Sequence, residues 1–182
     1  MPHALETRFR NARTAAEAAL ARRIQAREHA VWEALAAKSR LCEEIESGAV
    51  AAEDVEARWA VLPALGDAWE KRLVARRDAA LQAQADPAAA DALQRRIASG
   101  SDARRDELLQ LEAALGLASP PEYAAQRLAL QVRQLKERFS GGGSGSGTVN
   151  DRVLAWFATP GITDERDRQR GDAVLRALRN RS

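Results

Sequence analysis

Few side chains in this sequence belong to the types that commonly perform catalysis. The chain has two histidines, His3 and His29, and one cysteine, Cys42. His29 falls on the polar side of an expected helix with no orienting partner in the sequence, so we predict a surface histidine rather than a general base. Cys42 falls on an apolar helix face, where we expect a buried, unreactive thiol. A single cysteine forms no internal disulfide, which is typical of a reducing cytoplasm.

The sequence also lacks the common motifs for binding metals, phosphates or acyl groups. Cysteine and histidine do not occur at metal-ligand spacing, no glycine-rich loop opens a helix, and there is no nucleophile elbow. We therefore predict no catalytic, cofactor-binding or metal-binding residues, and we expect a protein that is not an enzyme.

Arginine shows the clearest pattern among the charged residues. Four Arg-Arg pairs recur, and pairs that faced one way would form a track for nucleic-acid phosphates. Acidic residues lie near most pairs, and aromatic residues for base stacking are not interleaved with them. We therefore favour salt-bridged helix surfaces over a nucleic-acid site. The candidate nucleic-acid residues are Arg22, Arg23, Arg76, Arg77, Arg95, Arg96, Arg104 and Arg105.

Three glutamates, Glu43, Glu44 and Glu46, gather near the C-terminal end of the first expected helix. Negative charge is unfavourable there because the helix dipole already places partial negative charge at that end. We interpret the cluster as a solvated helix end. The alternative is that it meets basic groups on a neighbouring element.

The element that positions most of these residues is a long helix expected from Leu5 to Ile45. The segment contains no glycine or proline, and good helix formers dominate it. Its apolar residues recur at steps of three, four or seven, which places them on one face. Such a helix is about 60 Å long. We predict that later segments cover this face along its whole length, including Phe9, Ile24 and Leu35.

Glycines, prolines and capping residues divide the rest of the chain into shorter helices. We expect these helices at residues 52–62, 67–84, 87–99, 102–115 and 119–139. A capping box of Ser119 and Glu122 starts the last of them. Its candidate core residues are Tyr123, Leu128, Val132, Leu135 and Phe139. No segment alternates with period two, so no sheet is expected.

The three tryptophans Trp32, Trp59 and Trp69 are expected to meet where the first three helices pack, because each can bury a large area.

Residues 140–147 read Ser-Gly-Gly-Gly-Ser-Gly-Ser-Gly, which predicts a loose tether with a span of roughly 15 Å. A natural low-complexity loop and an engineered joint both have this composition. Asn150 then caps a short helix, and Thr163 caps a last one. Two short helices cannot hold a core alone, so we expect them to dock on the bundle, on another copy or on a partner, with Trp156 and Phe157 as anchors.

Composition agrees with long helices that have solvated outer faces. Charged residues make up 30% of the chain, and 28 basic residues nearly balance 26 acidic ones. Because the charges nearly balance, the sequence pI of about 9.1 is only weak support for a polyanion partner such as a nucleic acid. No stretch approaches the roughly 20 apolar residues of a membrane span, and the first residues lack a signal-peptide pattern. We expect a cytoplasmic protein without membrane association.

Lys38, Leu41 and Glu43 form a Lys-x-x-Leu-x-Glu element on the long helix, and Trp59 follows on the return helix. This arrangement resembles a bacterial helical repeat family known as domain of unknown function number 349. Residues 107–139 resemble the end region of long members. Residues 154–161, Leu-Ala-Trp-Phe-Ala-Thr-Pro-Gly, resemble the tail of such proteins, which favours a natural or same-protein origin for the segment after the tether. The resemblance implies the C-terminal portion of a longer cytoplasmic protein, without known catalytic residues.

We therefore predict an all-α fold, with a long antiparallel, coiled-coil-like helical hairpin beside a smaller helical subdomain. Residues 1–85 form the hairpin and a third helix, 86–139 the subdomain, 140–147 the tether, and 148–182 a docking helical hairpin. The expected function is a non-enzymatic interaction or scaffold module that binds a protein partner. The alternative is an RNA- or ribosome-associated protein that binds through arginine-rich helix faces.

Overall fold

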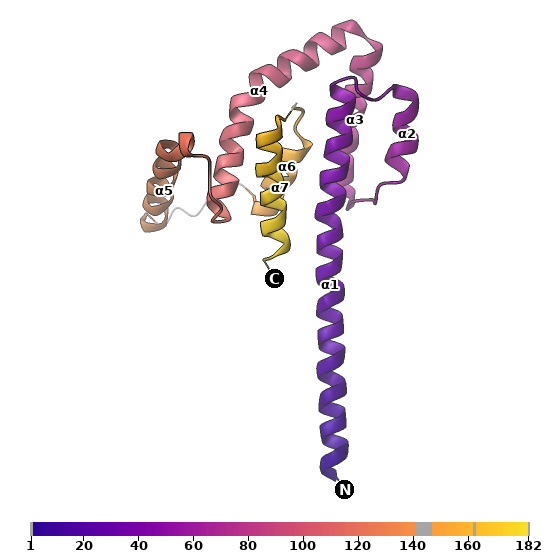
Figure 1. The fold of residues 1–182 in the computed structure, drawn as a ribbon, viewed down its shortest axis with the longest axis vertical. Coiled ribbons are helices and arrows are strands. Elements are labelled where there is room, and N and C mark those ends of the chain that lie inside the picture. Colours follow the sequence, from indigo (N-terminus) through magenta and orange to yellow (C-terminus); the bar gives the residue numbers. More distant parts are fainter. Residues whose placement is uncertain (1, 141–146, 162, 182) are drawn as a thin grey trace.

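The structure, a computed structural model, describes residues 2–140, 147–161 and 163–181, and the side chains of residues 2 and 3 are not described. The predicted all-α fold is confirmed, because these described residues form seven α-helices and a short 3₁₀ helix, with no strand (Figure 1). The helices are α1 (Pro2–Glu46), α2 (Ala52–Ala60), α3 (Asp67–Ala85), α4 (Pro87–Ala114), the 3₁₀ helix η1 (Pro121–Tyr123), α5 (Ala124–Phe139), α6 (Val149–Ala158) and α7 (Glu165–Arg179). Residues 141–146, most of the predicted tether, lie outside the described residues.

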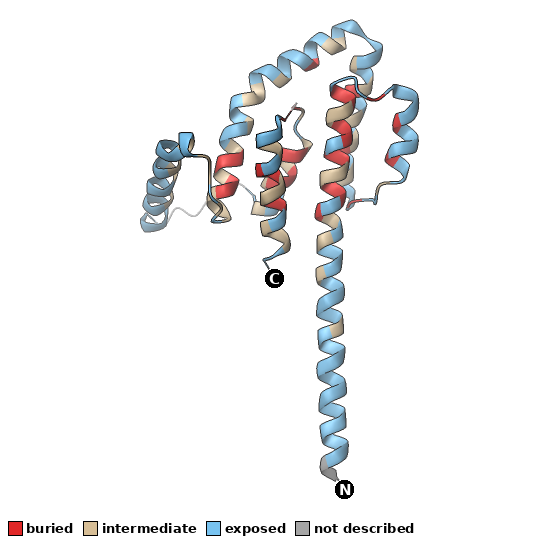
Figure 2. Cartoon of the chain, in the orientation of Figure 1, coloured by how far each residue is buried: buried red, intermediate tan, exposed pale blue. Residues whose placement is uncertain are grey.

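The helix α1 is unbroken, as predicted, but its N-terminal half packs against no other described element (Figures 1 and 2). Leu5 and Phe9 are 72% and 74% exposed, and Leu20 and Ile24 are 59% and 51% exposed. Among the described side chains of α1, the first buried one is Trp32. The prediction that this apolar face is covered along its whole length is therefore wrong. The reason is length, because α1 is about 68 Å long whereas α3 is about 28 Å long.

The C-terminal half of α1 packs most extensively on α3, which runs in the same direction. Along this pair, residue numbers rise together, from Lys38 against Glu70 to Ile45 against Gln84. The short helix α2 returns antiparallel to α1, so the chain starts α3 beside Trp32 of α1, where the ring of Trp69 meets that of Trp32. At the end of α1, Gly48 has a φ of 73°, a left-handed conformation that costs glycine little.

The two helices expected at 87–99 and 102–115 are one helix, α4, which arches from the α3 side over to α6 and α7 (Figure 1). The Oγ of Ser99 donates to the carbonyl oxygen of Arg96, and the Oγ of Ser101 donates to that of Ala98. These serines therefore bond within the helix instead of capping a new one. A glycine inside a helix, here Gly100, costs only about 1 kcal/mol, which packing on α3 and α6 readily offsets.

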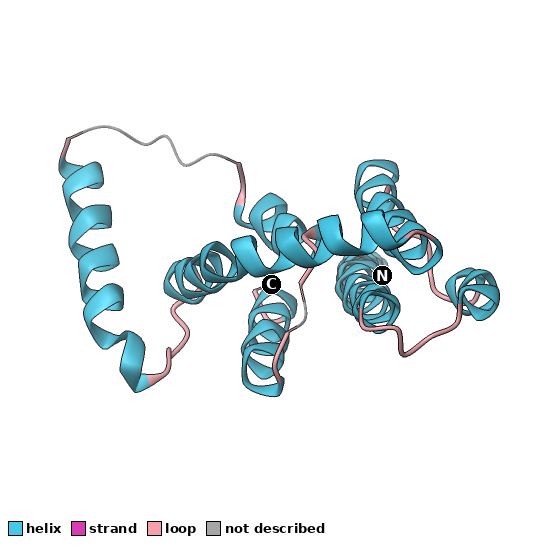
Figure 3. Ribbon diagram, turned by 90° about the horizontal axis from the view of Figure 1, so that it is seen from above, coloured by secondary structure: helices cyan, strands magenta, loops and turns pink. Residues whose placement is uncertain are grey.

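The C-terminal helices α6 and α7 lie between α1 and α4 (Figure 3). Trp156 and Phe157 are both buried there, with ring centroids 4.8 Å apart in a T-shaped arrangement. The caps of α6 and α7 are not the predicted residues Asn150 and Thr163. Thr148 caps α6 through a capping box with Asp151, and Asp164 caps α7. Both real caps have a side-chain oxygen that reaches the N3 backbone N–H.

The helix α5 lies at the edge of the molecule, and none of its residues is buried (Figure 2). The predicted core of this helix is therefore wrong, because Phe139 is 89% exposed and Leu128 is 62% exposed. The predicted capping box is also absent. Ser119 instead donates to the Oε2 of Glu112 at 2.6 Å and accepts from Arg127. Periodicity identified the apolar face of α5, but the helix contacts mainly η1 and α4.

Two of the three tryptophans meet directly. The rings of Trp32 and Trp69 lie 5.3 Å apart between α1 and α3. Trp59 is buried separately, with its ring 4.8 Å from the Nζ of Lys38. Cys42 is fully buried, as predicted.

Candidate interaction surface

A buried lysine fixes the root of the exposed helix. The Nζ of Lys38 lies 2.6 Å from both carboxylate oxygens of Glu70 on α3. Glu70 also accepts from the Nε1 of Trp59 on α2 and from the backbone N–H of Leu65. Burial alone raises the pKa of Glu70, but the hydrogen bonds from Lys38 and Leu65 outweigh it and lower that pKa. One carboxylate therefore ties three helices together.

A second buried ion pair lies at the C-terminal end of α1. Arg76 on α3 binds Glu46 in a bidentate arrangement, with nitrogen–oxygen distances of 2.7 and 2.8 Å. The same guanidinium donates to the carbonyl oxygen of Phe157 at 2.6 Å and to the Oγ of Ser39. Burial lowers the pKa of Arg76, but its hydrogen bonds with Glu46 raise that pKa overall, so the guanidinium stays charged.

Glu43 faces the loop between α6 and α7. Thr163 donates to Glu43 at 2.6 Å and accepts from Arg104 on α4 at 3.0 Å, and Arg168 on α7 lies 3.4 Å from the same carboxylate. The interpretation of the glutamate cluster as a solvated helix end is therefore wrong for Glu43 and Glu46. The alternative is correct, because basic groups from three other helices neutralise them. Their partners lie 30 or more residues away in sequence, so local spacing carries no signal for them.

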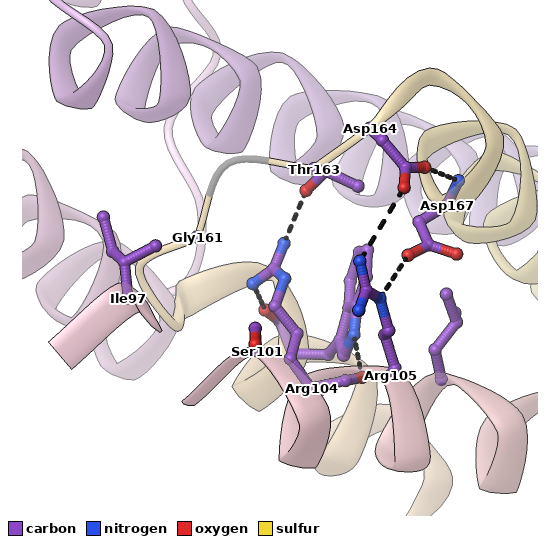
Figure 4. A pocket seen from close by; sticks show the side chains of 10 residues that line it. Ile97, Ser101, Arg104, Arg105, Gly161, Thr163, Asp164 and Asp167 are labelled. Carbon is purple, nitrogen blue, oxygen red and sulfur yellow. Dashed lines mark hydrogen bonds and ion pairs between the residues drawn. The ribbon is translucent and has the colours of Figure 1, made fainter. Parts of the chain in front are cut away.

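A cavity of about 100 Å³ lies beside this loop, between α4 and α7 (Figure 4). Its charged groups are already paired: Arg105 lies 3.4 Å from Asp167 and 3.9 Å from Asp164. Arg104 donates to the carbonyl oxygens of Trp156 and Thr159. Burial, reinforced by the nearby charge of Arg76, lowers the pKa of Arg104 to about 10, so this guanidinium remains protonated at neutral pH. The arrangement joins α4 to the loop and leaves few charged groups of the cavity available to bind a ligand.

The two residues considered for chemistry have structural roles. His29 is half-buried, and its Nε2–H donates to the carbonyl oxygen of Arg179 at 2.9 Å, which joins α1 to the end of α7. The surface position predicted for His29 is therefore only partly correct. Burial raises the pKa of the Cys42 thiol to about 12, so the thiol is neutral.

No group of three or more His, Cys, Asp or Glu side chains suited to a metal ion occurs in the described part of the chain. Within the same residues, no helix combines the length and apolarity needed to cross a membrane.

The remaining surface of interest is the exposed half of α1, which we define as residues 4–31. It carries six arginines and three glutamates, together with the exposed apolar residues Leu5, Phe9, Leu20 and Ile24. These four apolar residues follow one another at steps of 4, 11 and 4, all close to whole numbers of helical turns. They form one exposed apolar stripe along the helix.

Residues 4–78 match the family model described as Domain of Unknown Function (DUF349). The match supports the resemblance drawn from Lys38, Leu41 and Glu43. It spans the exposed half of α1, all of α2 and the part of α3 that carries Glu70 and Arg76. No curated protein and no solved structure shows a significant match to the chain. A repeat organisation and a C-terminal place in a longer DUF349 protein stay predictions.

The structure separates the eight candidate arginines. Within residues 4–78, which match the family model, Arg22 and Arg23 are exposed on the exposed half of α1, and Arg76 is buried against Glu46. Arg77 lies 4.9 Å from the ring of Trp59 and pairs with Asp78. Outside the segment, the members on α4 divide in the same way: Arg95 and Arg96 are exposed, whereas Arg104 and Arg105 pair with acidic groups.

Proposed function

We propose that this protein is a non-enzymatic interaction module of a bacterial cytoplasmic protein, in which a helical body presents the exposed half of α1 to a partner protein. One observation carries the proposal. Leu5, Phe9, Leu20 and Ile24 form a single apolar stripe that no other described part of the chain covers.

The stripe has a physical reason to be covered. Fully burying a Leu, Ile or Phe side chain is worth roughly 1.5–3 kcal/mol, and isolated helices depend largely on packing for their stability. A partner helix along the stripe thus gains several such contributions. Exposed apolar surface of this extent is typical of protein interaction sites.

The root of the helix is rigid, which suits a docking element. Lys38 and Glu46 both form ion pairs with α3, and Leu35 between the exposed half and these pairs is fully buried. The direction in which α1 leaves the body is therefore fixed, so a partner binds a helix that is already oriented.

The experiment is site-specific photocrosslinking in bacterial cells. A photoreactive phenylalanine replaces Phe9 or Ile24 on the stripe, and Ala18 serves as the matched control because it faces about half a turn away from Phe9. We expect discrete protein adducts from the stripe positions and few from Ala18. Equal labelling from both faces, or no protein adduct from the stripe, would exclude the proposal.

RNA binding is the second candidate, and the exposure of Arg22 and Arg23 favours it. A binder of this kind loses RNA affinity steeply with salt, because each phosphate contact releases a counterion. Retention on RNA that falls with salt, and that is lost in an Arg22→Gln/Arg23→Gln variant, would support this candidate. A response that is flat with salt would remove it.

A further inference from the structure

The exposed apolar stripe leads into a groove at the base of the helical body. A cavity of about 360 Å³ lies where α1 leaves the body, with Val31 and Trp32 on α1, Trp69 on α3, and Leu178 and Arg181 at the end of α7 among its lining residues. Trp69 and Leu178 are only half-buried, so the groove has an accessible apolar wall.

The stripe and the groove are continuous. Val31 lies seven residues after Ile24, which is close to two full helical turns, so both side chains point to the same side of α1. A straight ligand along Leu20 and Ile24 therefore reaches Val31 and the groove beyond it. An α-helix is the element that matches a straight stripe of this length.

The charge of this surface distinguishes two possible binding partners, a second copy of this chain and a different protein. Arg13, Arg23 and Arg27 lie three or four residues from stripe residues, and so do Glu6, Glu17 and Glu28. The exposed half as a whole carries six arginines and only three glutamates, so the surface around the stripe is basic overall. Arg13 pairs with Glu17 at 2.8 Å, but both side chains are largely exposed, and a surface pair of this kind is worth little. At the other end, Arg181 and Glu28 both line the groove, so the groove itself is close to neutral and the excess positive charge lies along the helix. A second copy of the chain brings the same arginine-rich helix against this surface, which is electrostatically unfavourable.

We propose that the exposed half of α1 and the groove together bind an acidic amphipathic helix of a partner protein. Its apolar face covers the stripe, and its carboxylates meet Arg13, Arg23 and Arg27. An apolar side chain at one end enters the groove against Trp32 and Trp69. This inference rests on the proposed function and adds the chemistry of the partner.

The test uses two synthetic peptides of four heptads, both with leucine at the core positions. The acidic peptide has glutamate at the flanking positions, and the basic peptide has lysine there. Binding to the full chain is measured by fluorescence anisotropy. We expect the acidic peptide to bind at least tenfold more tightly than the basic one. A Leu20→Asn/Ile24→Asn variant is expected to bind it at least tenfold more weakly, while Ala18→Asn on the opposite face leaves binding unchanged.

Charge-reversed variants test the electrostatic part. Arg13→Glu/Arg23→Glu/Arg27→Glu is expected to reverse the peptide preference, and Arg181→Glu to weaken acidic-peptide binding two- to fivefold. Circular dichroism confirms that each variant keeps its helix content. Equal binding of both peptides, or equally tight binding of polyglutamate or single-stranded RNA, would overturn the inference, because a general polyanion site needs no apolar helix face.

The two proposals fail in different ways. Stripe-dependent photocrosslinks without any acidic-peptide preference would overturn only this inference. Acidic-peptide binding without cellular adducts would instead count against the proposed function. Sedimentation of the chain alone adds one more outcome. A dimer abolished by Leu20→Asn/Ile24→Asn would identify a second copy as the occupant and overturn the acidic-helix inference.

Discussion

Arg76 and Glu46 form a bidentate ion pair whose two side chains are completely inaccessible to solvent. The pair joins α3 to the last turn of α1, and Arg76 also donates to the carbonyl oxygens of Phe157 in the last turn of α6 and of Gly161 in the loop after it. One guanidinium therefore connects three segments that are distant in sequence.

Removing Arg76 is expected to be strongly destabilising. An Arg76→Met variant leaves Glu46 buried without its partner, which typically costs about 3–5 kcal/mol. Arg77→Met is the control, since Arg77 pairs with Asp78 near the surface. Urea unfolding followed by circular dichroism measures both. Similar losses in the two variants would contradict the role assigned to the buried pair.

Substitutions in the exposed half of α1 are expected to leave the free energy of unfolding almost unchanged. Leu20→Asn/Ile24→Asn removes side chains that pack on no other described helix, so the free energy of unfolding of the body changes by no more than about 0.5 kcal/mol. Leu35→Ala, at a fully buried position on the same helix, is expected to cost about 2–5 kcal/mol. Thermal unfolding compares the two, and a large loss from the double variant would mean that the exposed half is covered.

Two glycines are expected to respond in opposite directions to replacement by alanine. Gly100 lies inside α4 with open space around its missing Cβ, so Gly100→Ala stabilises by about 0.5–1 kcal/mol. Gly48 has a φ of 73°, and Gly48→Ala destabilises by about 1 kcal/mol. The denaturant midpoints of the two variants show whether each substitution stabilises or destabilises the protein. A destabilising Gly100→Ala would show that α4 is not continuous there.

The Glu70 carboxylate is expected to make stability depend on pH. Its pKa is lowered from about 4.5 in the folded protein by the hydrogen bonds described above. Its contribution is therefore complete above the unfolded pKa and is lost as pH falls through the lower folded value. Glu70→Gln is expected to lose about 2 kcal/mol at pH 7, with a smaller difference from the wild type below pH 4. A constant difference across this range would argue against an ionised Glu70.

The Cys42 thiol is expected to resist modification. It is fully buried and its pKa is raised to about 12, so almost no thiolate is present at pH 8. Ellman's reagent is expected to react at least about a hundredfold more slowly with the native protein than with the protein in urea. An Ala18→Cys/Cys42→Ala variant, with the thiol on exposed helix, provides the fast control.

Local rules in the sequence determined where most helices occur. The absence of breakers predicts α1 as one helix, and Gly48 predicts its end. Asp86 and Pro87 start α4, and the Asp86 carboxylate accepts from two backbone N–H groups there. These features depend on neighbours within a turn or two of the same helix, so the sequence contains them.

The sequence alone also determined which faces are apolar, through the spacing of residues such as Phe9, Ile24 and Phe139. Only the tertiary structure decided which of these faces is covered: Leu35 is buried and Phe9 is not, although both lie on the same predicted face. It likewise decided that Glu43 and Glu46 meet arginines. The physical reason is that periodicity depends on one helix, whereas burial and ion pairing depend on where other helices end, and those distances are set by contacts between residues far apart in the chain.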